Sequence, residues 1–131
     1  MYNSDTLNGI FISLASAEVN IVRSPKSNLG YRVRLRICIR GNSDFLLGIQ
    51  RSLLQYEITS NYKESEHKGR PRPILIISGL DNLTRVLNLL TLDTPTNGEW
   101  TTFTKTLFMV KSKQHLSASG LDEILTMKGL L

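Results

Sequence analysis

The sequence predicts an α+β fold in which helices cover one face of a curved, four-stranded antiparallel sheet while the other face stays open and basic. One observation is the order of periodicities, which reads as an αββαββα core followed by further helical segments. A second is the run over residues 31–40, where apolar side chains alternate with arginines. The length of 131 residues and a hydrophobic content of 40% fit a single domain over residues 1–131.

The N-terminal segment predicts a helix followed by a hairpin. Apolar residues recur at helical spacing over residues 3–17, and the second half of this stretch is rich in small side chains. Residues 19–23 and 31–40 are predicted strands, and Pro25 and Gly30 mark the loop between them. Two strands joined by a loop are therefore expected directly after the first helix.

The remaining elements follow from the same two periodicities, with turn residues between them. We expect a helix over 45–54, a strand over 56–62, a loop over 63–73, a strand over 74–77, a helix over 81–90, a loop over 93–98, a helix over 99–110 and a last helix capped by Ser117 or Ser119. Trp100, Phe103, Leu107 and Phe108 are expected in the core of the penultimate helix.

The basic residues are distributed unevenly, and this points to a polyanion partner. The chain has a formal net charge of +5, and no Asp or Glu lies between Glu18 and Asp44. Solvated faces ordinarily mix both signs, so a one-sign face favours phosphate contacts. The predicted nucleic-acid-binding residues are those of the first hairpin and of the 63–73 loop: Arg23, Lys26, Arg32, Arg34, Arg36, Arg40, Lys63, Lys68, Arg70 and Arg72.

The sequence lacks the residues that several other functional classes require. The single cysteine, Cys38, lies within a predicted strand and is expected to be a structural thiol. With only His67 and His115 beside it, a zinc site is excluded. The sequence has no phosphate-binding glycine loop and no dinucleotide fingerprint. No apolar run reaches the roughly 18 residues that span a bilayer, so no membrane partner is expected.

Four segments, in order along the chain, resemble the LAGLIDADG homing endonucleases. Residues 12–21 resemble the family's motif, in which a helix end of small residues is followed by an acidic residue, a glycine and a strand. Residues 31–37 resemble the second strand, residues 45–50 the next helix, and residues 113–124 a C-terminal segment of one branch. The resemblance implies Mg²⁺-assisted hydrolysis of DNA phosphodiesters by carboxylates from two motif helices. A chain with one motif would have to dimerise to assemble that site.

Three departures from the family pattern argue against cleavage. Glu18 keeps the last acidic position of the motif and is the catalytic and metal-binding residue that the resemblance implies, but Ser16 replaces the earlier aspartate. Val19 replaces the motif glycine, where its side chain would obstruct the close helix packing of a homodimer. Glu99 falls near the place of a lysine that the family commonly uses. The resemblance is therefore to a degenerate, single-motif member.

We favour a nucleic-acid-binding protein, derived from such an endonuclease, that does not cleave and needs no cofactor. It would hold structured RNA or DNA on the basic sheet face, with protein partners in an organellar ribonucleoprotein such as the mitochondrial ribosome, or as an intron maturase. The resemblance favours a mitochondrion or plastid, and otherwise the cytoplasm. One alternative is an active homodimeric endonuclease that makes double-strand DNA cuts with Mg²⁺. Another is an interaction subunit whose basic face binds an acidic protein surface.

Overall fold

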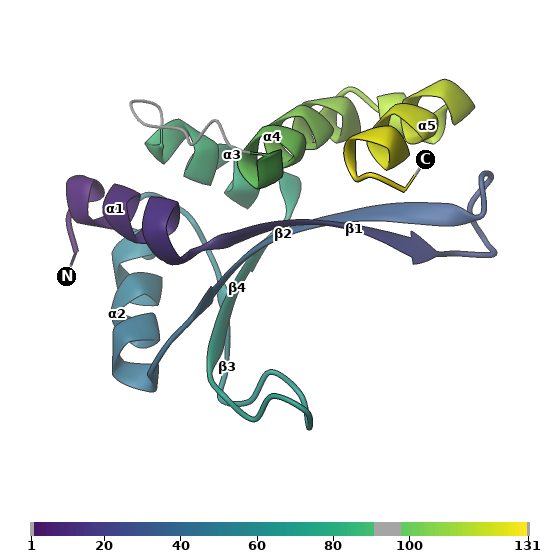
Figure 1. Ribbon diagram of the computed structural model, residues 1–131. Coiled ribbons are helices and arrows are strands. Elements are labelled where there is room, and N and C mark those ends of the chain that lie inside the picture. The colour runs from purple at the N-terminus through teal and green to yellow at the C-terminus, as the bar shows by residue number, and fades with distance from the viewer. Residues whose placement is uncertain (1, 91–97, 131) are drawn as a thin grey trace. The chain divides into compact units, whose positions relative to one another are not determined.

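The computed structural model describes residues 2–90 and 98–130, and Figure 1 labels most of its elements. In chain order the elements are α1 (Ser4–Leu14), β1 (Ser16–Arg23), β2 (Tyr31–Arg40), α2 (Ser43–Leu54), β3 (Asn61–Lys63), β4 (Ile74–Ser78), α3 (Leu80–Leu89), α4 (Gly98–Lys111), the 3₁₀ turn η1 (Gln114–Leu116) and α5 (Ala118–Met127). The strands form one antiparallel sheet in the order β1-β2-β4-β3. The α+β class and the predicted order of elements are confirmed. The loop expected over 93–98 lies almost wholly outside the described residues.

The chain divides into two compact units that share strand β2. The first comprises Met1–Ser16 and Arg36–Pro95, and the second comprises Ala17–Leu35 and Thr96–Leu131. The N-terminal half of β2 therefore belongs to the second unit and its C-terminal half to the first. Each unit has its own core.

The core of the first unit lies between the sheet and helices α2 and α3, which both contact β4. The antiparallel register places Ile37 opposite Ile77 and Ile39 opposite Leu75, and all four side chains are fully buried. Partners in register share a face of the sheet, so these residues form one apolar surface. Leu46, Ile49 and Leu53 of α2 and Leu83 and Val86 of α3 are buried on the helices.

The end of α2 explains why the expected strand over 56–62 is wrong. The Glu57 N–H donates to the Leu54 carbonyl at 3.1 Å and the Ile58 N–H donates to the Leu53 carbonyl at 3.1 Å. This pair of bonds is a Schellman cap, which requires a left-handed residue, and Glu57 has a φ of 59°. The first residues of the predicted strand therefore close the helix, and only Asn61–Lys63 remain as β3.

Replacing Glu57 by glycine is expected to stabilise the protein. A left-handed conformation costs a residue with a Cβ about 1–2 kcal/mol, and the greater entropy of unfolded glycine offsets part of the gain. We expect the free energy of unfolding to rise by about 1 kcal/mol in Glu57→Gly, measured by urea denaturation. Glu64→Gly is the control, because Glu64 has no positive φ and should only lose stability. A Glu57→Gly variant no more stable than the parent would contradict the cap assignment.

Helix α1 is shorter than expected, and the difference changes the place of the motif. Asn3 caps the helix by accepting from the Thr6 N–H at 2.9 Å, but the helix ends at Leu14 because Ala15 is extended, with φ −81° and ψ 144°. The expected boundary at residue 17 is therefore wrong. Ser16 already begins β1, which is hydrogen-bonded to β2, and pairing with that strand outweighs the weak helical preference of a few small residues.

The core of the second unit is formed largely by α4 and α5, which contact each other. Trp100, Phe103 and Leu107 are buried as predicted, and the two aromatic rings meet edge to face with centroids 6.0 Å apart. Phe108 was expected beside them, but it is 69% exposed because it lies one residue off the buried stripe. Ser117 caps α5 by accepting from the Gly120 N–H at 3.0 Å, which confirms one of the two predicted caps.

Candidate nucleic-acid interface

The hairpin of the second unit presents the predicted cationic side chains to solvent. Arg32 and Arg34 of β2 are exposed. Leu35, which lies between Arg34 and Arg36, is buried, with 6% of its surface exposed. Arg23, at the end of β1, is also exposed. Successive side chains of a strand point to opposite faces, so Arg32 and Arg34 lie on the face opposite Leu35. The alternation predicted from sequence holds here.

The loop that joins β1 and β2 is closed by its own hydrogen bonds. The Ser24 N–H donates to the Gly30 carbonyl at 2.9 Å, and the Ser27 hydroxyl donates to the Tyr31 carbonyl at 2.9 Å. Gly30 has a φ of 79°, which a residue with a side chain rarely adopts. This closure positions the exposed Lys26 beside a cavity of about 420 Å³. That cavity is lined by residues of the hairpin and of η1, including Lys26, Tyr31, Arg32 and His115.

The second half of β2, in the first unit, departs from a uniform basic face. Arg36 is half-buried and has an interaction within the chain. Cys38 is fully buried and not in a disulfide, which confirms it as a structural thiol. Arg40 is also half-buried. The exposed part of the arginine row (Arg32, Arg34, Arg36 and Arg40) is therefore its N-terminal half.

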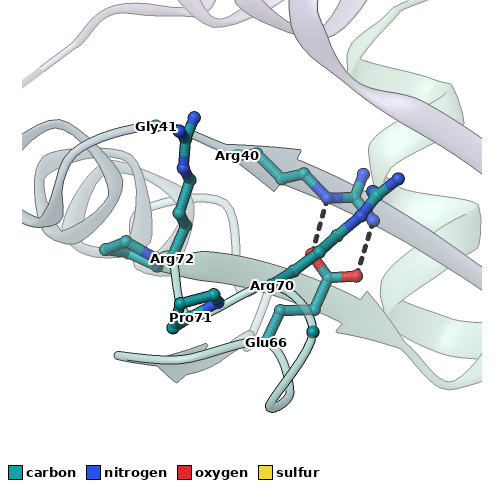
Figure 2. Close-up of a pocket in the computed structure, with 8 residues that line it drawn as sticks. Arg40, Gly41, Glu66, Arg70, Pro71 and Arg72 are labelled. Atoms are coloured by element: carbon teal, nitrogen blue, oxygen red, sulfur yellow. Dashed lines mark hydrogen bonds and ion pairs between the residues drawn. The ribbon is translucent and has the colours of Figure 1, made fainter.

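Arg40 is held by a carboxylate of the same chain. Its Nε donates to Glu66 Oε1 at 2.8 Å and its Nη2 donates to Glu66 Oε2 at 2.9 Å, as the dashed lines in Figure 2 mark. The side chains are 34% and 13% exposed, respectively. This two-bond geometry uses two of the donors that were predicted to contact phosphate. Arg40 therefore has a structural role, because it binds Glu66 of the same chain.

The Arg40 hydrogen bond lowers the pKa of Glu66 from 4.5 to about 2, although desolvation acts in the opposite direction. The positive charges of Arg40 and Arg70 also lower the pKa of Glu66, and so does His67. A carboxyl group with a lowered pKa stabilises the fold above its ordinary value and loses that contribution as the pH falls toward 2. The ion pair therefore stays intact throughout the neutral and mildly acidic range.

The 63–73 loop, called here the basic loop, is folded back on itself. The Glu66 N–H donates to the Arg72 carbonyl at 3.0 Å, and His67 and Arg70 form an isolated antiparallel bridge. Lys63 Nζ donates to the Glu66 carbonyl at 3.0 Å. Beside the Arg40–Glu66 pair lies a cavity of about 710 Å³ that is also lined by Arg70 and Arg72. Lys68 is exposed at the tip.

Sequence reasoning missed Glu66. It stands among the basic residues of the 63–73 loop, and no local pattern marks it. It lies 26 residues from Arg40, so no local spacing connects the two. Only the pairing of β2 with β4, which places Arg40 opposite Ile74, brings the loop to that arginine.

Glu18 lies within strand β1 rather than at a helix end. Burial raises the pKa of Glu99 in the first turn of α4, and the negative charge of Glu18 raises it further, whereas Lys128 lowers it. The two carboxylates are thus near enough to repel each other. No group of three or more His, Cys, Asp or Glu among the described residues is placed to hold a metal ion.

Val19 does not strain the backbone. It is a regular strand residue, 3% exposed, and lines a cavity of about 300 Å³ with Glu99 and Thr102. Within the described residues, the non-glycine positions with positive φ are Glu57 and Lys113. A β-branched side chain suits a strand, so Val19 is compatible with the strand that was predicted over residues 19–23.

No described helix combines the length and the apolar character needed to cross a bilayer.

The comparisons with known proteins place the fold. A scan against models of protein families and a search of curated proteins both find no match. Among solved structures, the homing endonuclease I-TnaI superimposes with a TM-score of 0.81 at 18% identity, covering 97% of this chain and 85% of that one. The LAGLIDADG homing endonuclease I-LtrWI, bound to target DNA, gives 0.83 at 20% identity, covering 99% and 44%. The LAGLIDADG meganuclease I-CpaMI, bound to uncleaved DNA, gives 0.80 at 21%, covering 98% and 43%.

Proposed function

We propose that this chain, which has the fold of the LAGLIDADG homing endonucleases, binds nucleic acid through its basic sheet residues and does not cleave it. The observation that carries the proposal is the exposed pair Arg32 and Arg34 on β2. This strand lies in the stretch between Glu18 and Asp44, which contains no Asp or Glu. I-LtrWI and I-CpaMI, which have this fold, are bound to DNA in their solved structures. Guanidinium groups bind phosphate oxygens in pairs, which suits a strand that follows a nucleic-acid backbone.

The lack of cleavage is proposed from the motif itself. Ser16 stands where a second carboxylate would be, and the carboxylate near Glu18 of β1 is Glu99 of helix α4. Mg²⁺ is usually held by one or two carboxylates together with waters and phosphate oxygens. With Ser16 at the earlier acidic position, the motif of this chain supplies Glu18 alone to such a site.

A cleavage assay tests this part of the proposal. We expect no Mg²⁺-dependent product from a randomised duplex library, and the same result for the parent protein and for Glu18→Gln. Sequencing of the DNA ends would detect cleavage at any site in the library, whereas a single substrate tests only one site. Cleavage by the parent that disappears in Glu18→Gln, while the exposed control Glu123→Gln keeps it, would establish the endonuclease alternative instead.

One observation favours that alternative enough to keep it. The chain spans 44% of I-LtrWI and 43% of I-CpaMI, and two copies of it together would have about the length of either. Sedimentation equilibrium distinguishes the two cases. A monomer in the presence of DNA and Mg²⁺ supports the binding protein, and a dimer that also cleaves supports the endonuclease.

The finer proposal is that the natural ligand is structured RNA in an organellar ribonucleoprotein, or an intron bound by a maturase. A basic surface fits both A-form RNA and B-form DNA, whose grooves differ in shape. Competition between matched RNA hairpins and DNA duplexes for the protein decides the preference. Crosslinking in isolated mitochondria or plastids, followed by sequencing of the bound RNA, tests the proposed location; recovery of genomic DNA alone would contradict it.

A further inference from the structure

The basic loop is tied to the sheet around one buried residue. The register places Ile74 of β4 between Arg40 of β2 and Lys63 of β3, on the same face. Both flanking cations contact Glu66. Arg40 binds the side-chain carboxylate of Glu66, and Lys63 donates to the backbone carbonyl oxygen of Glu66. Ile74 is fully buried although it lies on the face opposite the helix-covered core. Glu66 thus ties together the two side chains that flank Ile74.

The same arrangement fixes the direction of the loop beyond Glu66. The Glu66 N–H donates to the Arg72 carbonyl, so the outgoing and returning segments of the loop are hydrogen-bonded to each other at Glu66. The tip is closed by the Arg70 N–H, which donates to the His67 carbonyl at 2.9 Å, and by the Gly69 N–H, which donates to His67 Nδ1 at 3.0 Å. Figure 2 shows Arg72 directed toward Gly41 and Arg70 running toward the ion pair. Two exposed arginines are thereby held at the rim of one cavity.

We propose that the Arg40–Glu66 ion pair holds the basic loop as a preformed pocket for a backbone phosphodiester, with Arg70 and Arg72 as the contacting residues. Glu66 and Arg40 are then positioning residues, and Glu66 promotes binding although its own charge opposes a polyanion. The inference rests on the proposed nucleic-acid binding and reassigns Arg40 within it. A cavity of about 710 Å³ is in the range that holds a nucleotide-sized group.

The physical reason is preorganisation. A loop that is ordered before binding does not lose conformational entropy when its arginines meet phosphate, and that entropy otherwise weakens the complex. Simple electrostatics predicts the opposite sign, because removal of a negative charge from a basic surface should strengthen polyanion binding. The sign of the effect at Glu66 therefore separates the two accounts.

The experiment measures the affinity of the full chain for a random-sequence DNA duplex by fluorescence anisotropy at pH 7. We expect Glu66→Gln to bind about tenfold more weakly, since both loop arginines lose their fixed positions. Glu66→Asp should also bind more weakly; it keeps the charge but is too short for both bonds with Arg40. The control Glu64→Gln removes the same charge from an exposed position of the same loop and should bind as tightly as the parent or slightly more tightly.

Hydrogen exchange supplies a second readout that does not depend on DNA. The amides of Glu66, His67 and Arg70 should exchange faster in Glu66→Gln and Glu66→Asp, and at the parent rate in Glu64→Gln. Binding by Glu66→Gln that equals or exceeds the parent's would overturn the proposal, as would unchanged exchange. If poly-glutamate displaced the DNA as well as unlabelled duplex of equal charge did, the phosphodiester assignment would fail. A parent protein that binds no nucleic acid at all would instead overturn the proposed function, and exchange alone would then decide whether the ion pair orders the loop.

Discussion

Replacing Arg32 and Arg34 together by glutamine is expected to weaken duplex binding about 30-fold at near-physiological salt. Each phosphate neutralised by a cation releases condensed counterions, which contributes roughly 0.9 to the slope of log affinity against log salt. Two lost contacts should therefore lower that slope by about 1.8, and the affinity by about 30-fold at ~0.15 M salt. Both side chains are exposed and lie on one face of β2, so the substitution removes contacts without opening the core.

The control for this variant must lose the same charge elsewhere. Arg51 of α2 and Lys105 of α4 are exposed on helices, and Arg51→Gln/Lys105→Gln keeps the same net charge as the test variant. We expect this control to change the salt slope by far less, because helix charges act only through the general field. Urea denaturation should give both variants the parent's stability. Equal loss of affinity in the two variants would mean that net charge, and not the sheet face, determines binding.

Strand β2 shows how far the sequence predicted this interface. Strict alternation specified which side chains share a face, and the exposure of Arg32 and Arg34 and the burial of Ile37 and Ile39 follow from it. Alternation carries no information about what else approaches the face. Cys38 is fully buried on the arginine side of the strand, which only the sheet partners of β2 could determine.

The errors at element boundaries have local physical causes. Residues 56–60 alternate in polarity like a strand, but the hydrogen bonds of a helix cap determine their conformation. Residues 15–17 are small and weakly specified, so pairing of β1 with β2 outweighed their helical preference. The ion pair of Arg40 with Glu66 depends on a contact across 26 residues, which no single-sequence pattern contains.

Gly120→Ala is expected to be the most destabilising single substitution of those considered. A Cβ at this position would overlap the backbone carbonyl oxygen of Gln114 and press on Ser117 Oγ, 3.0 Å away. The obstacle is backbone, so no rotamer change can relieve it, and α5 must move away from η1. Overpacking of this kind costs about 3 kcal/mol, which outweighs the ~1 kcal/mol that alanine gains over glycine within a helix. Urea denaturation would measure the loss.

Gly9→Ala is the matched control, because Gly9 lies within α1 and a Cβ there meets no atom within 4 Å. It should gain up to about 1 kcal/mol from helix propensity alone. Equal stability of the two variants would mean that η1 is not packed on α5. The Gly120 result also bears on binding, since His115 and Leu116 of η1 line the cavity beside Lys26 and Arg32. Gly120→Ala should therefore raise hydrogen exchange at Gln114–Leu116 and disturb that hairpin, whereas Arg32→Gln/Arg34→Gln should lose affinity with stability unchanged. These opposite responses separate the packing that positions the hairpin from the charges that it presents.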